Sequence, residues 1–176
     1  PEPIRVSLEK CSPVIRGFGT EEHKRRWLPD LLAGKALACQ MFSEPEPGSD
    51  VASVRTRAVC DGDEWVLSGQ KVWTTNDHLG KIGILLARSD PSVPKHRGLS
   101  MFLIELDSPG VEIRPIHQVD GGMEFDEIFL DGLRLPSEAL LGSAGDGWQV
   151  ASAMMLFQRI ARGTSNIGEV AHEFYD

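Results

Sequence analysis

A chain of 176 residues, 41% of them apolar and 25% charged, can bury the core of one globular domain with extensions. A formal net charge of −8 argues against a nucleic-acid surface, and no apolar run is long enough to cross a membrane. Three widely spaced cysteines favour reduced thiols inside a cell, and the five histidines lack the spacing of a metal site. The chain starts without methionine, and we expect it to be cut from a longer protein.

The first strong pattern along the chain predicts helix over residues 20–34. Thr20 is a suitable N-cap, Glu21 and Glu22 would occupy the first turn, and Gly34 could end the helix. Pro29 lacks a backbone N–H and would interrupt a continuous helix, so we predict two short helical segments here.

The middle of the chain, from Ala36 to Ser143, has the pattern of short strands separated by turns. A hairpin is predicted where Asp61-Gly62-Asp63 separates two of these runs. Many short runs at this spacing favour antiparallel strands in a barrel or a sandwich. The runs cover residues 36–43, 54–60, 64–69, 70–75, 82–89, 99–106, 111–117 and 126–135.

Residues 147–176 contain no proline and predict one long helix. Apolar residues recur there at helical spacing, among them Val150, Met154, Phe157, Ile160, Ile167 and Val170. Such a stripe is typical of packing against a core or against a partner helix, and it does not indicate a cofactor site.

Two polar stretches interrupt the strand pattern, and either could bind a ligand. They are SEPEPGSD at residues 43–50 and SGQKVWTTN at residues 68–76. Taken singly, each has a structural explanation, because Ser43 can form a turn and a strand tryptophan such as Trp73 is usually packed. Glu44 and Asp50 could work as an acid–base pair, but a solvated turn is the better explanation of them. The sequence contains no glycine-rich phosphate loop and no nucleophile elbow.

Taken together, in this order and at this separation, the two stretches resemble the acyl-CoA dehydrogenase family. Its members carry Thr/Ser-Glu-Pro-x-x-Gly-Ser-Asp and then Gly-x-Lys-x-Trp-x-Thr-Asn on a flavin-binding β-domain. Residues 18–40 and 125–148 also resemble the segments that enter and leave this β-domain. The resemblance implies a mainly β fold with flanking α-helices, divided into the end of an N-terminal helical domain (1–35), a central flavin- and acyl-CoA-binding β-barrel (36–143) and the first helix of a C-terminal helical domain (144–176).

The resemblance also implies FAD as the cofactor and gives roles to individual residues. The backbone near Phe42 and the Ser43 hydroxyl would donate to the N1/O2 edge of the flavin, Trp73 would lie against the ring, and Thr75 would bond N5. Arg159 matches an active-site arginine of the family, although it can equally be a surface residue of a helix. The set implied for the cofactor is Gln40, Met41, Phe42, Ser43, Gly48, Ser49, Trp73, Thr74 and Thr75, and the set implied for the substrate is Ser49 and Arg159.

The activity that the resemblance implies is oxidation of an acyl-CoA to its 2,3-enoyl-CoA, with electrons passed from FAD to an electron-transfer flavoprotein. The catalytic base is expected beyond Asp176, because Gln158 occupies the earlier helix position at which a minority of relatives carry it. We expect a homo-oligomer, dimer or tetramer, in the bacterial cytoplasm or the mitochondrial matrix. An acyl-CoA oxidase or flavin monooxygenase of the same fold and a non-catalytic β-barrel interaction module are the alternatives.

Overall fold

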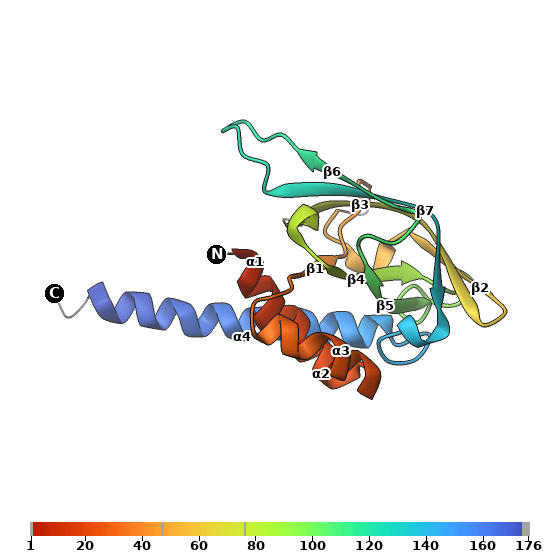
Figure 1. Cartoon of the computed structure of the whole chain (residues 1–176), viewed down its shortest axis with the longest axis horizontal. Helices are drawn as coiled ribbons and strands as arrows, with labels where there is room; N and C mark the ends of the chain where they lie inside the picture. The colour runs from red at the N-terminus through yellow and green to blue at the C-terminus, as the bar shows by residue number, and fades with distance from the viewer. Residues whose placement is uncertain (1, 47, 76, 174–176) are drawn as a thin grey trace.

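The computed structural model describes residues 2–46, 48–75 and 77–173, which form a curled sheet with a layer of helices beside it (Figure 1). The helical segments are α1 (Glu2–Arg5), the π-helix η1 (Val6–Cys11), α2 (Ser12–Phe18), α3 (Glu21–Leu32) and α4 (Gly147–Glu173). The strands are β1 (Ala38–Met41), β2 (Arg57–Asp61), β3 (Glu64–Thr75), β4 (Ile82–Arg88), β5 (Leu99–Glu105), β6 (Val111–Ile116) and β7 (Phe125–Pro136). Short 3-10 helices lie in the connections as η2 (Val51–Ser53), η3 (Asp77–Leu79) and η4 (Ser137–Ala139).

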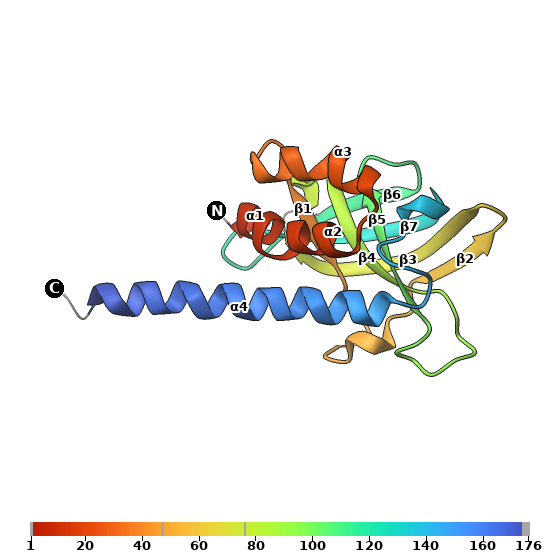
Figure 2. The same cartoon turned by 90° about the horizontal axis from the view of Figure 1, so that it is seen from below.

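The strands form one sheet in the order β1-β4-β2-β3-β7-β6, and β5 pairs with the other side of β4. The sheet curls into a half-barrel, and Figures 1 and 2 show α1 to α3 and α4 lying together on one side of it. The predicted mainly β fold with flanking helices is therefore confirmed. The predicted hairpin is confirmed as well, since β2 and β3 pair antiparallel up to Asp61 and Glu64.

Two hydrophobic cores hold this arrangement together, one on each face of β4 and β5. Every residue of β4 from Ile82 to Ala87 is buried, which is expected for a strand that is covered on both faces. The core between helices and sheet includes Val14, Ile15, Leu31, Ile84, Leu86, Met101, Val150 and Met154. The core inside the curl includes Met41, Leu67, Leu85, Phe102, Ile128 and Leu133.

Most strand pairs are antiparallel, as the pattern of the sequence favoured, but β4 has parallel neighbours along one edge. β1 runs parallel to β4, with Ala38 opposite Ile82, and β2 also meets β4 in parallel through Arg57 and Arg88. Parallel neighbours need a long connection between them. The β2–β3 hairpin occupies the connection between β1 and β4, and spacing alone does not reveal that arrangement.

The prediction that Pro29 divides the helix is also wrong. α3 is continuous from Glu21 to Leu32 with Pro29 inside it, and it begins at Thr20 as predicted. The Thr20 hydroxyl accepts a hydrogen bond from the backbone N–H of His23 at 3.1 Å. Trp27 and Leu31, one turn apart and on either side of the proline, are both buried. Their packing offsets the hydrogen bond that proline cannot donate, a loss that typically costs about 3 kcal/mol.

The two strand runs predicted at residues 64–69 and 70–75 are one strand, β3. It pairs with β7 along its length, and the register shifts twice, between Leu67 and Gly69 and between Lys71 and Thr74. Each shift indicates a bulge, which bends a strand and turns individual side chains to a different face. The second shift lies at the predicted cofactor motif.

The long helix α4 begins against the barrel and then extends beyond it (Figure 2). Val150, Ala151 and Met154 at its start are buried, whereas Leu156 and Ile160 are exposed. The side chains of Ile167 and Val170, which belong to the predicted apolar stripe, lie outside the described part of the chain. Among the residues that the structure describes, no helix is both long and apolar enough to span a membrane.

Gly147 sets how closely α4 approaches β5, and this contact gives a stability test. A Cβ at residue 147 would lie 2.6 Å from the carbonyl carbon of Leu99 and from the amide nitrogen of Ser100. Gly147→Ala should therefore lower the free energy of unfolding by about 1–3 kcal/mol, as overpacking of a filled site usually does. The matched control is Gly17→Ala in α2, where a Cβ meets nothing within 4 Å. Urea denaturation of both variants that gave equal midpoints would contradict this assignment.

Candidate functional site

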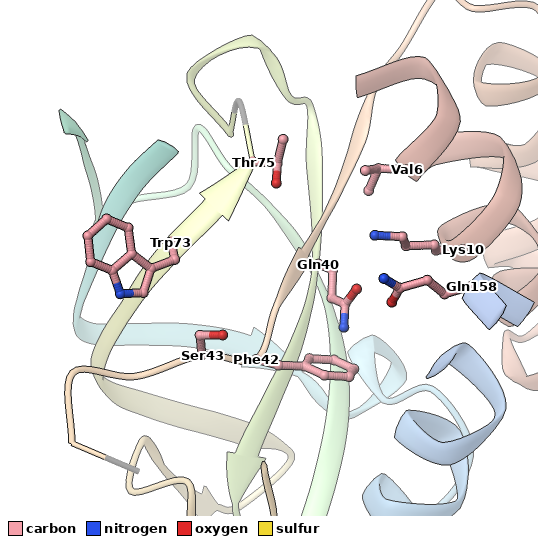
Figure 3. Close-up of a pocket in the computed structure, with 8 residues that line it drawn as sticks. All are labelled: Val6, Lys10, Gln40, Phe42, Ser43, Trp73, Thr75 and Gln158. Carbon is pink, nitrogen blue, oxygen red and sulfur yellow. The ribbon is translucent and has the colours of Figure 1, made fainter. Parts of the chain in front are cut away.

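A pocket of about 250 Å³ opens between the barrel and the helical layer, at the ends of β1 and β3. Its barrel wall consists of Gln40, Phe42, Ser43, Trp73 and Thr75. Its helix wall consists of Val6 and Lys10 from η1 and Gln158 from α4. Figure 3 shows the two walls facing each other across the pocket. The two sequence motifs, about 30 residues apart in the chain, therefore meet at one site.

Backbone carbonyls of the first motif are held by residues of the second. The Lys71 ammonium donates to the carbonyl oxygen of Phe42 at 3.2 Å, and the Val72 N–H donates to the carbonyl oxygen of Ser43 at 3.0 Å. A third bond at 2.7 Å ties the Lys71 ammonium to the carbonyl of Leu86 in β4. These bonds fix two successive carbonyls and with them the backbone of Ser43, which lines the pocket.

Glu44 completes this network from inside the fold. Its carboxylate accepts from the Lys71 ammonium at 2.8 Å, from the Thr56 amide at 2.9 Å and from the Thr56 hydroxyl at 2.6 Å. The other carboxylate oxygen accepts from the Arg55 amide at 2.6 Å. The side chains of Lys71 and Glu44 are 0% and 4% exposed. This is a buried ion pair whose remaining lone pairs and protons are satisfied, the condition under which such a pair is tolerated. Its carboxylate is thus a structural group, and the acid–base hypothesis for Glu44 and Asp50 has no support.

Burial acts on the pKa values of Lys71 and Glu44 in opposite directions. Burial lowers the pKa of Lys71 to about 8, although the charge of Glu44 and its hydrogen bond act to raise it. Burial also acts to raise the pKa of Glu44, but the Lys71 charge and the hydrogen bonds from Lys71, Thr56 and Arg55 outweigh it, so that the pKa lies below the ordinary value. Both groups are charged at neutral pH as a result.

Trp73 reaches the pocket wall through a local distortion of β3. It has φ 60°, the only positive φ among the described residues other than glycine. Consecutive residues Lys71 and Val72 are both buried at the adjoining register shift, and the Trp73 side chain then turns outward, 60% exposed. A bulky residue in the left-handed region is strained, and such strain concentrates at binding sites. The indole meets Phe125 edge-on, with ring centroids 6.2 Å apart.

Several polar groups of the pocket have no hydrogen-bond partner among the described residues. They include the hydroxyls of Ser43 and Thr75, the indole N–H of Trp73 and the side-chain amides of Gln40 and Gln158. Gln40, Thr75 and Gln158 are half-buried, whereas Ser43 and Trp73 are exposed, so a ligand or water can reach each of these polar groups. The chemistry of this set suits a flat aromatic group with polar edges, since an exposed indole stands beside two hydroxyl donors.

Not all of the residues predicted for the cofactor offer their side chains to this pocket. Met41 and Thr74 point into the barrel, where Met41 belongs to the core and the Thr74 hydroxyl donates to the carbonyl of Asp126 at 3.0 Å. Gly48 and Ser49 are exposed in the loop after β1 and do not line the pocket. Arg159 is likewise exposed, so α4 turns Gln158, not Arg159, toward the pocket. Pro47 and Asn76, which belong to the motifs, lie outside the described residues.

The helix wall was missed by sequence reasoning. Val6 and Lys10 belong to residues in which neither a motif nor a strong periodicity is visible. The π-helix that carries them is fixed by Ser7, whose hydroxyl accepts from the Ala38 amide at 2.8 Å and donates to the carbonyl of Pro3 at 2.9 Å. The Ser12 hydroxyl in turn donates to the carbonyl of Ser7 at 2.8 Å. Ser7 and Ser12 are buried, which their sequence does not indicate, so no sequence signal marked this wall.

Comparisons with known proteins identify the family to which this fold belongs. The family model described as the acyl-CoA dehydrogenase middle domain matches residues 39–132, more than half of the chain. The chain belongs to the acyl-CoA dehydrogenase family. It is 46% identical over 161 residues to the acyl-CoA dehydrogenase IpdE1 of Mycobacterium tuberculosis, covering 92% of this chain and 41% of that protein. The family resemblance inferred from the motifs is confirmed.

Two solved structures are similar to this chain in fold. A glutaryl-CoA dehydrogenase of Mycobacterium smegmatis in complex with FADH2 has a TM-score of 0.80 and 34% identity, over 90% of this chain and 40% of that one. The prolyl acyl carrier protein oxidase AnaB has a TM-score of 0.81 and 33% identity, over 89% of this chain and 42% of that one. The chain thus spans about two fifths of the length of these three relatives.

The buried pair gives the second stability test. Glu44→Gln leaves the Lys71 ammonium buried without a counter-charge, and breaking a buried pair in this way typically costs about 3–5 kcal/mol. The matched control is Glu46→Gln two residues later, whose partner Arg55 is exposed with it. Loss of an exposed pair costs about 1 kcal/mol or less. Denaturation curves that placed the two variants within about 1 kcal/mol of each other would contradict the assigned role of Glu44.

The pKa of Lys71 also predicts a pH dependence. Between about pH 8 and the ordinary lysine value of 10.5, the unfolded chain binds more protons at this residue than the folded chain does. Stability rises with pH wherever the unfolded state binds more protons. The free energy of unfolding of the wild type, measured relative to Lys71→Met, should therefore rise across this window. A constant or falling difference would show that Lys71 is not desolvated in solution.

Proposed function

We propose that the chain is the barrel-centred part of a flavin-dependent acyl-CoA dehydrogenase, which oxidises an acyl-CoA to its 2,3-enoyl-CoA. The observation that carries the proposal is the pocket between the walls, where hydroxyl donors without partners stand beside the outward-turned Trp73. The family membership and the FADH2 complex of a related glutaryl-CoA dehydrogenase support FAD as the group that this pocket takes.

The barrel wall would hold the flavin ring. Trp73 would cover part of a ring face, while the hydroxyls of Ser43 and Thr75 would donate to its polar edge. When bound, FAD supplies the acceptor for the hydride that leaves Cβ of the acyl group. Donors fixed where negative charge develops stabilise the transition state more than the ground state. Ser43 suits that role because the bonds of Lys71 and Val72 fix its backbone in advance.

None of the described side chains that line this pocket is a carboxylate. Gln158, on the helix wall, has an amide that cannot accept a proton at neutral pH. We infer that the base which removes the Cα proton comes from another part of the whole protein. Gly48, Ser49 and Arg159 do not line the pocket of this chain. We therefore infer that they would contact the acyl-CoA only together with other parts of the whole protein.

We further infer that the whole protein passes its electrons to an electron-transfer flavoprotein. An oxidase is the second candidate, because AnaB, a prolyl acyl carrier protein oxidase, has the same fold over most of this chain. The two functions differ in the electron acceptor. Rapid reoxidation of the reduced protein in air favours the oxidase, and slow reoxidation in air with rapid reoxidation by electron-transfer flavoprotein favours the dehydrogenase.

Two measurements on the full-length protein test the proposal: its flavin content and reduction, and the effect of substitutions at Ser43. The purified protein should contain FAD, and a suitable acyl-CoA should bleach the flavin spectrum in the absence of oxygen. Removal of one preorganised donor of this type costs about 10²–10³ in rate, so Ser43→Ala should slow flavin reduction by up to that factor. Ser43→Thr keeps the hydroxyl and should retain most of the rate. Stopped-flow traces that are unchanged in Ser43→Ala would remove Ser43 from the site, and a protein that takes up no FAD would overturn the function.

A further inference from the structure

A buried aspartate of β7 lies beside the last residues of β3. The side chain of Asp126 is 0% exposed. Asp126 is the register partner of Thr74, and Phe125 is the partner of Thr75. The backbone carbonyl of Asp126 accepts a hydrogen bond from the Thr74 hydroxyl at 3.0 Å. Asp126 therefore holds the residue that directly precedes Thr75, which belongs to the barrel wall of the pocket.

The carboxyl group of Asp126 holds the chain on the other side of Thr75. It accepts a hydrogen bond from the backbone N–H of His78 at 3.2 Å. Both of its oxygens also lie 3.0 Å from the ring atom Nδ1 of His78. His78 belongs to η3, which begins two residues after Thr75. Asp126 thus contacts the chain one residue before Thr75 and again three residues after it.

The burial of Asp126 makes these contacts a constraint on the chain. A carboxyl group at this depth that lacked hydrogen-bond partners would be strongly destabilising. The backbone N–H and the ring of His78 supply such partners. Because they can do so only while η3 stays next to β7, the requirement to satisfy Asp126 limits the positions open to the segment between Thr74 and His78.

The neighbour of Asp126 supports the other aromatic and polar groups of the barrel wall. Consecutive residues of a strand point to opposite faces, and Phe125 accordingly turns away from the buried side on which Asp126 lies. The Phe125 ring meets the indole of Trp73 edge-on, with centroids 6.2 Å apart. Figure 3 shows Trp73 and Thr75 at the end of the same strand. Two adjacent residues of β7 therefore support both of them from behind.

We infer that Asp126 is a positioning residue for the Thr75 hydroxyl, acting through its bonds to Thr74 and His78. The inference rests on the proposed function, in which the Thr75 hydroxyl donates to FAD. Asp126 does not line the pocket, so its effect on the cofactor is indirect. That effect should therefore disappear once the Thr75 hydroxyl has been removed, whereas a general role in the fold would weaken the site whether or not the hydroxyl is present.

The test is a double-mutant cycle on the full-length protein, measured by its affinity for FAD. Thr75→Val removes the hydroxyl at nearly constant shape, and Asp126→Ala removes both oxygens. His78→Ala removes the ring from a side chain that is 32% exposed, so this variant should fold. Each single variant should bind FAD roughly three- to tenfold more weakly, as loss of one hydrogen bond would produce. In the Thr75→Val background, the other two substitutions should add less than about twofold.

The absorption spectrum of the bound flavin gives a second measurement, because hydrogen bonds to the ring shift its visible bands. Asp126→Ala and His78→Ala should shift these bands in the same direction as Thr75→Val. Asp126→Asn keeps an oxygen that accepts from the N–H of residue 78, so it should retain most of the wild-type spectrum and affinity. The matched control is Asp131→Ala, at an exposed aspartate of β7 outside the pocket, which should change neither.

Additive effects would overturn the inference. If His78→Ala or Asp126→Ala weakens FAD binding by the same factor with and without the Thr75 hydroxyl, Asp126 supports the fold and does not act through that hydroxyl. Unchanged affinity and spectrum in the folded variants would also overturn it. Circular dichroism shows which variants fold, and the His78→Ala cycle decides alone if Asp126→Ala does not.

The outcomes also separate this inference from the function on which it rests. A wild-type protein that contains FAD and is bleached by an acyl-CoA, but whose cycles are additive, retains its function and loses the assigned role of Asp126. A wild-type protein that holds no FAD loses both.

Discussion

The pocket depends on one buried lysine. Lys71 is fully buried, and its ammonium is bonded to the carboxylate of Glu44 and to the backbone carbonyls of Phe42 and Leu86. An isolated charge at this depth would be strongly destabilising, so each of its three partners is needed. Because those partners come from the loop after β1 and from β4, the requirement to satisfy one ammonium fixes three segments of chain relative to one another.

That constraint explains the shape of the barrel wall. Lys71 and Val72 are consecutive and both face inward, which an undistorted strand does not allow. The register shift after Lys71 and the positive φ of Trp73 accommodate them and turn the indole outward. The satisfied ion pair therefore lies behind the pocket, while the hydroxyls of Ser43 and Thr75 and the indole N–H of Trp73 in front of it have no hydrogen bond to another described residue. This is the arrangement expected of a preorganised binding site, in which the supporting groups are satisfied and the presenting groups are not.

Sequence reasoning found the elements that depend on local chemistry. The N-cap at Thr20, the hairpin at Asp61 to Glu64 and the long helix from Gly147 follow from residue types and spacing, and the structure contains them. The family and the barrel-wall residues Ser43, Trp73 and Thr75 followed from two motifs. The continuity of α3 could not be predicted in this way, because the packing of Trp27 and Leu31 outweighs the local effect of Pro29.

The remaining features depend on contacts between distant segments. A lysine in a strand is expected to be exposed to solvent. Nothing near Lys71 in the sequence indicates that Glu44 will pair with it in the interior. The helix wall was invisible for the same reason, since Val6, Lys10 and Gln158 line the pocket only after η1 and α4 have packed beside β1. Arg159 is exposed while its neighbour Gln158 lines the pocket, because adjacent residues of a helix point in directions about 100° apart, and its role at the substrate stays a prediction.

The central claim is that the buried pair positions the flavin donors, and the flavin affinity of Glu44→Gln tests it most directly. The full-length protein, Glu44→Gln and the exposed control Glu46→Gln would be titrated with FAD at a temperature at which circular dichroism shows all three to be folded. The account predicts that Glu44→Gln binds FAD at least about tenfold more weakly, as loss of one or two positioned hydrogen bonds would produce, and that Glu46→Gln binds it as the wild type does. A folded Glu44→Gln protein with unchanged affinity for FAD would contradict the account.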